Sequence, residues 1–357
     1  MFVSALGAIT GSGNRLGLRR VTSACVILVD GLGAHNLLSN SGHAPFISQA
    51  SMSKIGTVFP STTAAAISSF ATGQMPGVHG VVGYQVFDRK AQAPLNLLTG
   101  LNDQTVGDWQ RFETVSAVAR AQGVNVYSVG PGEYSKSGFT SATMPGAEFV
   151  AGKTVSDRFS AAAKLLSTGK NKLVYLYVPE LDQRAHAYGT TSSQWRDMLE
   201  ELNAEVKRFV QDLPKGTGAL LTADHGIVDV DKAHHVYLDE YNDAIPGLVS
   251  VGGDPRVLYL YFEPGETPET RKELLEDALK ERAAVFTSSE VCAAGYFGNV
   301  SLESRDTLPD LMVFARPRSA LYHRGFAKPK SLQMIGQHGG ISPEELMVPL
   351  VRFGAFV

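Results

Sequence analysis

The chain has 357 residues, of which 44% are hydrophobic and 19% charged. This composition provides enough apolar side chains for a large core and excludes a chain that is disordered throughout. The 32 basic and 35 acidic residues leave a formal net charge of -3, and no run of lysine and arginine marks a surface for nucleic acid or an anionic membrane. The length is typical of two to three domains, or of one large α/β domain with an insertion.

Three features of the sequence bear on where the protein resides. Within the first twenty residues the basic side chains follow the short apolar stretch, which reverses the order of a signal peptide. No stretch approaches the roughly 20 apolar residues that span a bilayer, and the two cysteines, Cys25 and Cys292, are too few for a disulfide framework. We therefore expect a cytoplasmic protein with reduced thiols and no membrane or nucleic-acid polymer as partner.

Short apolar runs rich in β-branched residues alternate with helical stretches over the first 223 residues. The predicted strands are Cys25–Asp30, Lys54–Phe59, Val124–Val129, Leu173–Val178 and Ala219–Ala223. The predicted helices are Ala44–Ala50, Thr63–Ala71, Glu113–Ala121, Asp157–Leu166 and Ser193–Gln211. Continuous apolar strands interleaved with helices are typical of a mainly parallel sheet that is covered by helices on both faces. The predicted fold class is therefore α/β.

The pattern changes after residue 231. An acidic, irregular stretch at Tyr237–Ile245 comes first. The elements predicted after it are a strand at Val257–Phe262, a helix at Glu269–Arg282, and strands at Ala283–Thr287, Leu311–Ala315 and Met347–Phe356. We interpret residues 232–334 as a smaller α/β subdomain, which is inserted into a catalytic α/β domain of residues 1–231 and 335–357.

Acidic and imidazole side chains follow several of the predicted strands, where ligands of an open α/β sheet bind. They are Asp30 after the first strand, Asp182 and His186 after the fourth, Asp224 and His225 after the fifth, and His338 in a glycine-rich loop near the C-terminus. Any one of them is more often a turn or surface residue than a ligand. Together they are the oxygen and nitrogen donors that Zn²⁺, Mn²⁺ and Fe prefer, and six donors are enough for two cations.

The charge of such a site favours a phosphate-type ligand. Three carboxylates and two divalent cations leave a net charge of +1 when the imidazoles are neutral. Two cations about 3.5–4 Å apart hold the attacking and leaving oxygens of an in-line displacement. The hydroxyls of Thr62 and Thr63 stand at a predicted helix start, where backbone N–H groups can receive the transferred group. A metal-activated threonine is a competent nucleophile.

Five segments of the sequence, taken in their order along the chain, resemble motifs of the alkaline phosphatase superfamily, and within it of the type I phosphodiesterase/nucleotide pyrophosphatase family. The segments are VDG at Asp30, FPSTT…ATG at Phe59–Gly73, ELDQRAHAYG at Asp182 and His186, TADHG at Asp224 and His225, and QHGG at His338. The resemblance covers nearly all of residues 21–357. It implies a two-zinc phosphoryl-transfer site, with one zinc bound by Asp182, His186 and His338 and the other by Asp30, Asp224 and His225.

The resemblance also implies a nucleophile. The family pattern is aromatic-Pro-x-x-Thr, followed by the glycine of a Thr-Gly pair ten residues later, and Thr63 fits it with Phe59 and Gly73. Thr62 then becomes a neighbour that could cap the helix. The phosphodiesterase branch has an asparagine that donates to a phosphate oxygen where this chain has Ala66, so the substrate stays open, and Tyr84 is a candidate for the missing donor. For His79, a structural role is favoured over catalysis.

The sequence disfavours a dinucleotide-binding enzyme and a serine hydrolase. A dinucleotide-binding turn after the first strand would need glycine where Asn36 stands, and no G-x-S-x-G motif of a serine hydrolase is present. We expect a phosphodiesterase or nucleotide pyrophosphatase that acts on a small phosphate ester or nucleotide. A phosphomonoesterase or phosphonate hydrolase is the alternative within the superfamily. A non-catalytic metal-binding protein is the alternative of another class, and metal content combined with activity separates them.

Overall fold

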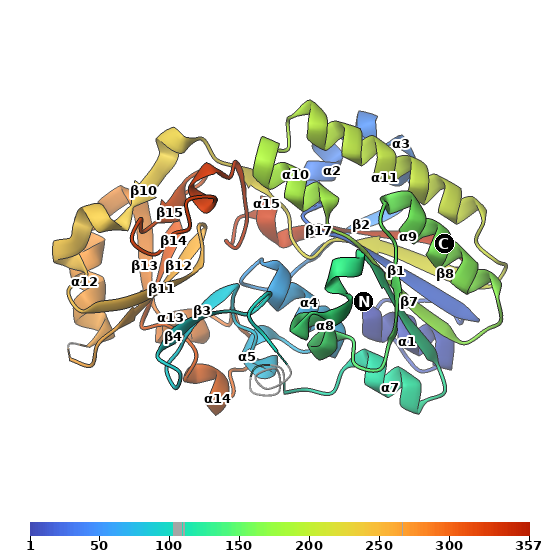
Figure 1. The fold of residues 1–357 in the computed structure, drawn as a ribbon, viewed down its shortest axis with the longest axis horizontal. Helices are drawn as coiled ribbons and strands as arrows, with labels where there is room; N and C mark the ends of the chain where they lie inside the picture. Colours follow the sequence, from blue (N-terminus) through green and yellow to red (C-terminus); the bar gives the residue numbers. More distant parts are fainter. Residues whose placement is uncertain (103–108, 110, 266) are drawn as a thin grey trace.

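The computed structural model describes residues 1–102, 109, 111–265 and 267–357. Its larger part is built on a seven-stranded sheet with the strand order β2-β17-β8-β1-β7-β5-β6 (Figure 1). The strands are β1 (Ser23–Val29), β2 (Ser51–Gly56), β5 (Asn125–Gly130), β6 (Glu148–Ala151), β7 (Lys172–Val178), β8 (Thr217–Thr222) and β17 (Met347–Gly354). Strand β17 runs antiparallel to β2 and β8, whereas β8, β1, β7, β5 and β6 pair in parallel.

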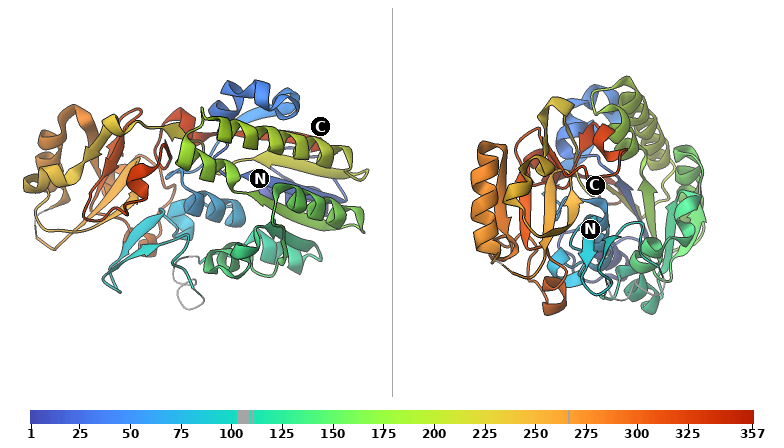
Figure 2. Two further views of the ribbon diagram at one scale, coloured as in Figure 1. Left: turned by 45° about the horizontal axis from the view of Figure 1, so that its top comes forward. Right: turned by 60° about the vertical axis from the view of Figure 1, so that its left-hand side comes forward.

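Helices cover both faces of this sheet (Figure 2). One face carries α2 (Ala34–Ser39), α3 (Pro45–Gln49), α9 (Val155–Ser167), α10 (Glu180–Tyr188) and α11 (Ser193–Gln211). The other carries α1 (Phe2–Thr10), α4 (Thr63–Thr72), α7 (Val115–Ala121) and α8 (Gly138–Thr143). Successive side chains of β1 enter opposite cores, Val26 one and Ile27 the other. The predicted class, a mainly parallel sheet flanked by helices, is confirmed.

Local hydrogen bonds set the helix starts. Ser192 accepts the N–H of Trp195 at the start of α11, whose bounds are those predicted. Helix α9 begins at Val155, two residues before the predicted start, because Thr154 and Asp157 form a reciprocal capping box in which Asp157 is the third helical residue.

The second predicted strand is displaced. Strand β2 spans Ser51–Gly56 instead of Lys54–Phe59, lies at the end of the sheet, and pairs with β17. Its mostly exposed residues carry little apolar signal. Phe59, which suggested a strand, is buried instead and stacks on Phe314 of the smaller sheet, with ring centroids 5.6 Å apart. The backbone pairing with β17, and not apolar periodicity, therefore sets these bounds.

A second, four-stranded antiparallel sheet lies beside the first, in the order β11-β12-β14-β13 (Figure 1). Its strands are β11 (Leu248–Asp254), β12 (Val257–Phe262), β13 (Ala283–Thr287) and β14 (Leu311–Ala315), and α12 (Pro268–Leu279) packs on it. Helix α12 ends before the predicted Arg282, because Lys280 has a φ of 49°. The hairpin of β3 (Gln85–Asp88) and β4 (Ala93–Asn96) packs against β11. The smaller lobe therefore draws on two distant parts of the sequence.

Further short elements complete the chain. They are α5 (Pro76–His79), β9 (Val228–Asp229), β10 (His235–Tyr237), α13 (Ser288–Ala293), α14 (Leu302–Arg305), β15 (Ala320–Tyr322), β16 (Gly336–Gln337) and α15 (Pro343–Leu346). The stretch predicted to be irregular begins at the last residue of β10 and contains 3-10 turns over Leu238–Ala244. Both cysteines are free thiols. Among the residues described, we find no helix with the length and apolar composition that crossing a bilayer requires.

Candidate active site

The carboxyl ends of three neighbouring strands define one edge of the large sheet. Strands β7, β1 and β8 pair in parallel, so the residues that follow them lie side by side. The loop after β16 reaches the same place, because β16 pairs antiparallel with β9, which closely follows β8. The structure brings all six predicted ligands to this edge: Asp30, Asp182, His186, Asp224, His225 and His338.

Asp30, Asp224 and His225 form one compact group. Their ligand atoms lie within 4.8 Å of one another, with His225 Nε2 at 3.3 Å from Asp30 Oδ1 and 3.6 Å from Asp224 Oδ2. Asp224 Oδ1 accepts the N–H of Gly31 at 3.1 Å, and Asp30 Oδ2 accepts the hydroxyl of Tyr177. Each carboxylate therefore has one oxygen fixed by a donor and the other turned to the imidazole.

Asp182, His186 and His338 form the neighbouring group. Asp182 Oδ2 lies 3.2 Å from His186 Nε2, and Asp182 Oδ1 lies 3.9 Å from His338 Nε2. The other ring nitrogens face carbonyl oxygens, His186 Nδ1 that of Gly336 at 2.7 Å and His338 Nδ1 that of Ser61 at 3.2 Å. A proton on Nδ1 leaves the lone pair on Nε2 free for a cation. The tighter grouping of ligand atoms within 4.8 Å contains His225 in place of His186.

Three buried carboxylate oxygens in this cluster lack a hydrogen-bond partner among the described residues. They are Asp30 Oδ1, Asp182 Oδ1 and Asp224 Oδ2. An unpaired buried charge is costly, and such charges in proteins are paired or coordinate metals. Carboxylate oxygen together with imidazole nitrogen is a donor set that Zn²⁺ accepts. The residues present therefore fit divalent cations.

The electrostatics of the cluster follow from burial and crowding. Burial and two neighbouring aspartates raise the pKa of Asp30 well above its ordinary value. Burial also acts to raise the pKa of Asp182, but His186 and His338 outweigh it and hold that pKa below the usual range. Burial acts to lower the pKa of His186, and the Asp182 carboxylate reverses this and raises it to about 9. The surrounding protein groups therefore disfavour the state in which every carboxylate of the cluster is ionised. Added positive charge would stabilise that state.

Thr63 faces the cluster from the start of α4. Its Oγ1 lies 3.2 Å from His225 Nε2, and the residue is 6% exposed. Thr62 occupies the N-cap position, but its side chain makes no capping hydrogen bond, contrary to the capping role considered for it. The Thr62 hydroxyl is buried, has no hydrogen-bond partner among the described residues, and lies near the carboxyl of Asp254, the last residue of β11. Ala66 is buried one turn into α4 and offers no side-chain donor.

A cavity of about 440 Å³ opens over the cluster. Asp30, Thr63 and His338 are among the residues that line it. Tyr84 and Asn96 also line the cavity, and burial raises the pKa of the Tyr84 hydroxyl, so that it stays protonated. From the predicted insert, the cavity is lined by Tyr322, Phe326, Lys328, Lys330 and Met334, among others.

Sequence reasoning missed two residues of the site. Tyr177 belongs to an apolar strand, and only the pairing of β7 with β1 in register brings its hydroxyl to Asp30. Asp254 is the last residue of β11 in the smaller sheet, and burial raises its pKa to about 7. The sequence does hold one signal for Tyr177: a tyrosine hydroxyl in a buried strand needs a hydrogen-bond partner.

His79 lies outside the cluster, in agreement with a structural role. It is fully buried, its Nδ1 accepts the N–H of Val81 at 3.1 Å, and its Nε2 lies 2.8 Å from Ser69 Oγ. Because Nδ1 accepts, Nε2 carries the proton and cannot act as a base. Burial lowers the pKa of His79 to about 3, so the ring is neutral.

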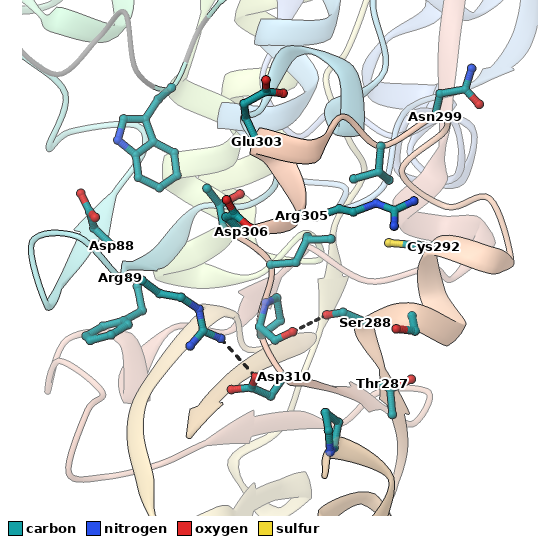
Figure 3. Close-up of a pocket in the computed structure, with 18 of the residues that line it drawn as sticks. Asp88, Arg89, Thr287, Ser288, Cys292, Asn299, Glu303, Arg305, Asp306 and Asp310 are labelled. Carbon is teal, nitrogen blue, oxygen red and sulfur yellow. Dashed lines mark hydrogen bonds and ion pairs between the residues drawn. The ribbon is translucent and has the colours of Figure 1, made fainter. Parts of the chain in front are cut away.

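A larger hollow of about 1130 Å³ lies in the smaller lobe, between β3, α13 and α14 (Figure 3). Figure 3 shows charged side chains of both signs along it. Arg89 and Asp310 form an ion pair there, with Nη2 and Oδ1 3.1 Å apart. None of the six clustered ligands lines this hollow. It therefore does not compete with the smaller cavity as the candidate active site.

The fold and the cluster together define an α/β protein of the alkaline phosphatase type, with an acidic and imidazole site at the strand ends. Residues 24–341 match the family model for type I phosphodiesterase / nucleotide pyrophosphatase, and the chain belongs to this family. The family is one of metal-dependent hydrolases. The family predicted from the sequence is confirmed.

Known proteins resemble the chain over different lengths. The human ectonucleotide pyrophosphatase/phosphodiesterase family member 1 is 23% identical over 268 residues, which are 68% of this chain and 27% of that protein. The chain thus spans about a quarter of the length of this relative. Murine ectonucleotide pyrophosphatase/phosphodiesterase 5, as an inactive variant in complex with AMP, has a TM-score of 0.72 at 15% identity and covers 94% of this chain and 88% of that one. The human counterpart has a TM-score of 0.71 at 16% identity, covering 93% and 88%.

Proposed function

We propose that the protein is a two-metal phosphodiesterase or nucleotide pyrophosphatase with Thr63 as its nucleophile. One observation carries this proposal: Thr63 Oγ1 lies 3.2 Å from His225 in a cluster whose three aspartates each keep one unpaired oxygen. Family membership supports hydrolysis of phosphoric esters. The AMP bound to the murine relative supports a nucleotide as the substrate class.

We assign the six ligands to two cations. Asp30, Asp224 and His225 would hold one, and Asp182, His186 and His338 the other; both groups combine carboxylate oxygens with imidazole nitrogens. Zn²⁺ suits these donors best, and Mn²⁺ and Fe are the alternatives. When bound, the two cations would stabilise negative charge on the attacking and leaving oxygens of an in-line displacement.

The chain's own groups perform the remaining tasks. Thr63 Oγ1 loses its proton to solvent and attacks phosphorus; a bond between Oγ1 and phosphorus forms, and the bond to the leaving oxygen breaks. Thr63 is the first residue of α4, so the N–H groups of the first helical turn lie beside the hydroxyl and can donate to phosphoryl oxygens. Water then hydrolyses the phosphothreonine and restores the hydroxyl. Two in-line displacements give net retention at phosphorus.

Tyr84 is our candidate for the donor that Ala66 lacks. It lines the same cavity as Thr63, and burial keeps its hydroxyl protonated by raising its pKa. A phenol donates one hydrogen bond, which is the task of the asparagine in the phosphodiesterase branch. We therefore assign Tyr84 to a non-bridging phosphate oxygen of the substrate.

The loop of the predicted insert supplies positive charge over the cavity. Lys328 and Lys330 line it and are exposed. A leaving group that carries its own phosphate would bring negative charge to these lysines, whereas a neutral alcohol would not. This feature favours a substrate with a P–O–P bond over a simple diester. The cytoplasmic location expected from the sequence stays a prediction.

A substrate panel with zinc-loaded protein tests the proposal. It compares bis-p-nitrophenyl phosphate, p-nitrophenyl phosphate, phenylphosphonate esters, dinucleotides and nucleotide sugars, with Thr63→Ala as the control. We expect kcat/KM to be highest for the dinucleotides or nucleotide sugars. A preference for the monoester or the phosphonate would select an alternative hydrolase, and full metal content without any activity would select the non-catalytic protein.

A further inference from the structure

Arg256 is a buried cation at the junction of the two lobes. It stands in the turn between β11 and β12 and is 3% exposed. Its Nε and Nη2 each lie 3.1 Å from one carboxylate oxygen of Glu345, which is fully buried. Its Nη1 donates to the carbonyl oxygens of Arg316, at 2.9 Å, and Ser319. Carbonyl oxygens of the smaller lobe thus fix the guanidinium. Its contact with Glu345 is bidentate, which is the geometry that arginine forms with a carboxylate.

Glu345 connects this pair to the loop that carries His338. Its Oε1 accepts the N–H of Gly340 at 2.8 Å, two residues after His338, and its Oε2 accepts the N–H of Ser342 at 3.3 Å. A Cβ on Gly340 would come within 2.7 Å of Glu345 Oε2. Any side chain at that position would therefore displace the carboxylate from the backbone of the loop.

The same loop is tied to the segment of the nucleophile. Ser61 Oγ donates to the carbonyl oxygen of Gly340 at 2.8 Å and accepts the N–H of Gly339 at 3.2 Å. His338 Nδ1 faces the carbonyl oxygen of Ser61 at 3.2 Å. A shift of Gly340 away from Glu345 would therefore move both the imidazole of His338 and its partner Ser61.

We propose that Arg256, acting through Glu345, is a positioning residue for His338 and so for one of the two cations. The inference rests on the proposed function, because His338 is a metal ligand only under that proposal. The smaller lobe then contributes to the metal site itself, in addition to lining the cavity. Without Arg256, Glu345 would lose two of its four donors, and the loop would lose the fixed acceptor that orders Gly340.

The variants are Arg256→Met, Arg256→Lys and Glu345→Gln, with Arg271→Met as the matched control. Arg271 is also a buried arginine of the smaller lobe, 6% exposed, and its Nη2 donates to the carbonyl oxygen of Glu263 at 2.9 Å, within that lobe. The measurements are Co²⁺ titration followed by visible absorption, zinc content, kcat and KM, thermal unfolding, and hydrogen exchange of the Gly340 amide.

We expect Arg256→Met to bind one cation as the wild type does and the other about 10- to 100-fold more weakly, the usual effect of removing an outer-shell partner. The value of kcat should fall with little change in KM, and the Gly340 amide should exchange at least about tenfold faster. Arg256→Lys should be intermediate, since an ammonium cannot make the two-point contact. Arg271→Met should lose thermal stability without any of these changes.

Two results would overturn the inference: wild-type affinity for both cations in folded Arg256→Met, or equal losses of metal binding in Arg256→Met and Arg271→Met. Should Arg256→Met fail to fold, Arg256→Lys and Glu345→Gln decide by the same measurements. A wild-type protein that binds no cation would overturn the proposed function instead. The exchange rate of the Gly340 amide would then still show whether Arg256 orders the loop.

Discussion

Replacing Thr63 with alanine separates the catalytic role of this residue from its structural role. The change removes one hydrogen-bonding hydroxyl, 3.2 Å from His225, and one methyl group from a site that is 6% exposed. A hydrogen bond and a buried methyl each contribute about 1 kcal/mol, so the free energy of unfolding should fall by about 2 kcal/mol. That is a fraction of the roughly 5–15 kcal/mol that keeps a domain folded.

The effect on the reaction should be larger. Without Oγ1 no covalent intermediate can form, and we expect kcat to fall at least about 1000-fold, equivalent to about 4 kcal/mol of barrier at 1.36 kcal/mol per factor of ten. Thr63→Ser should keep partial activity, because a hydroxyl remains. The measurements are steady-state hydrolysis of a dinucleotide, zinc content and thermal unfolding, and zinc content should stay at the wild-type level.

Thr62→Ala is the matched control, because it removes the same atoms from a fully buried neighbour whose hydroxyl lies near Asp254 and makes no hydrogen bond to the cluster. Its kcat should stay within about tenfold of the wild type. Equal losses in the two variants would refute the assignment of Thr63. A chiral thiophosphate substrate gives an independent check, since inversion at phosphorus would mean direct attack by water.

Three further predictions concern the metals, the substrate and the pH dependence of stability. His338→Ala should lower zinc occupancy at one site only, and chelators should abolish activity that zinc restores; full zinc content in the variant would remove His338 from the ligand set. Lys328→Ala and Lys330→Ala should raise KM for a dinucleotide several-fold but not for bis-p-nitrophenyl phosphate, and equal changes for both substrates would exclude contact with a second phosphate. His79 has a folded-state pKa of about 3, below its ordinary value of 6.5, so the unfolded chain binds the extra proton. Its contribution to stability is therefore present above about pH 6.5 and is lost as the pH falls, by up to about 1.4 kcal/mol per unit. Between pH 4 and 7, the free energy of unfolding measured with denaturant should vary less with pH in His79→Gln than in the wild type. An equal pH dependence in the two proteins would show that His79 is not its source.

The candidate site draws on both lobes of the protein. The large sheet supplies the clustered ligands and Thr63, whereas the smaller lobe supplies Asp254 at the end of β11 and Arg256 from the turn that follows. Arg256 makes hydrogen bonds to Glu345, and Asp254 lies near Thr62. Changes in the smaller lobe should therefore alter metal binding as well as substrate choice.

Much of the architecture follows from the sequence alone. Strands buried on both faces must be apolar throughout, so β1, β7 and β8 appear as continuous apolar runs between helical stretches. The carboxyl ends of parallel neighbours share an edge, and the order of the elements is therefore enough to predict that side chains following such runs, among them Asp30 and Asp224, meet there. Thr63 required in addition the resemblance to a known family.

Only the tertiary structure decides the contacts that leave no local pattern. The pairing of β17 between β2 and β8 fixes the bounds of an exposed edge strand, and the hairpin of β3 and β4 joins the smaller lobe from a distant part of the chain. Tyr177 reaches Asp30 through strand register, and Arg256 reaches Glu345 across 89 positions of sequence. Periodicity reports which face of an element is buried, but not which distant group lies against it, because that depends on how the finished elements pack.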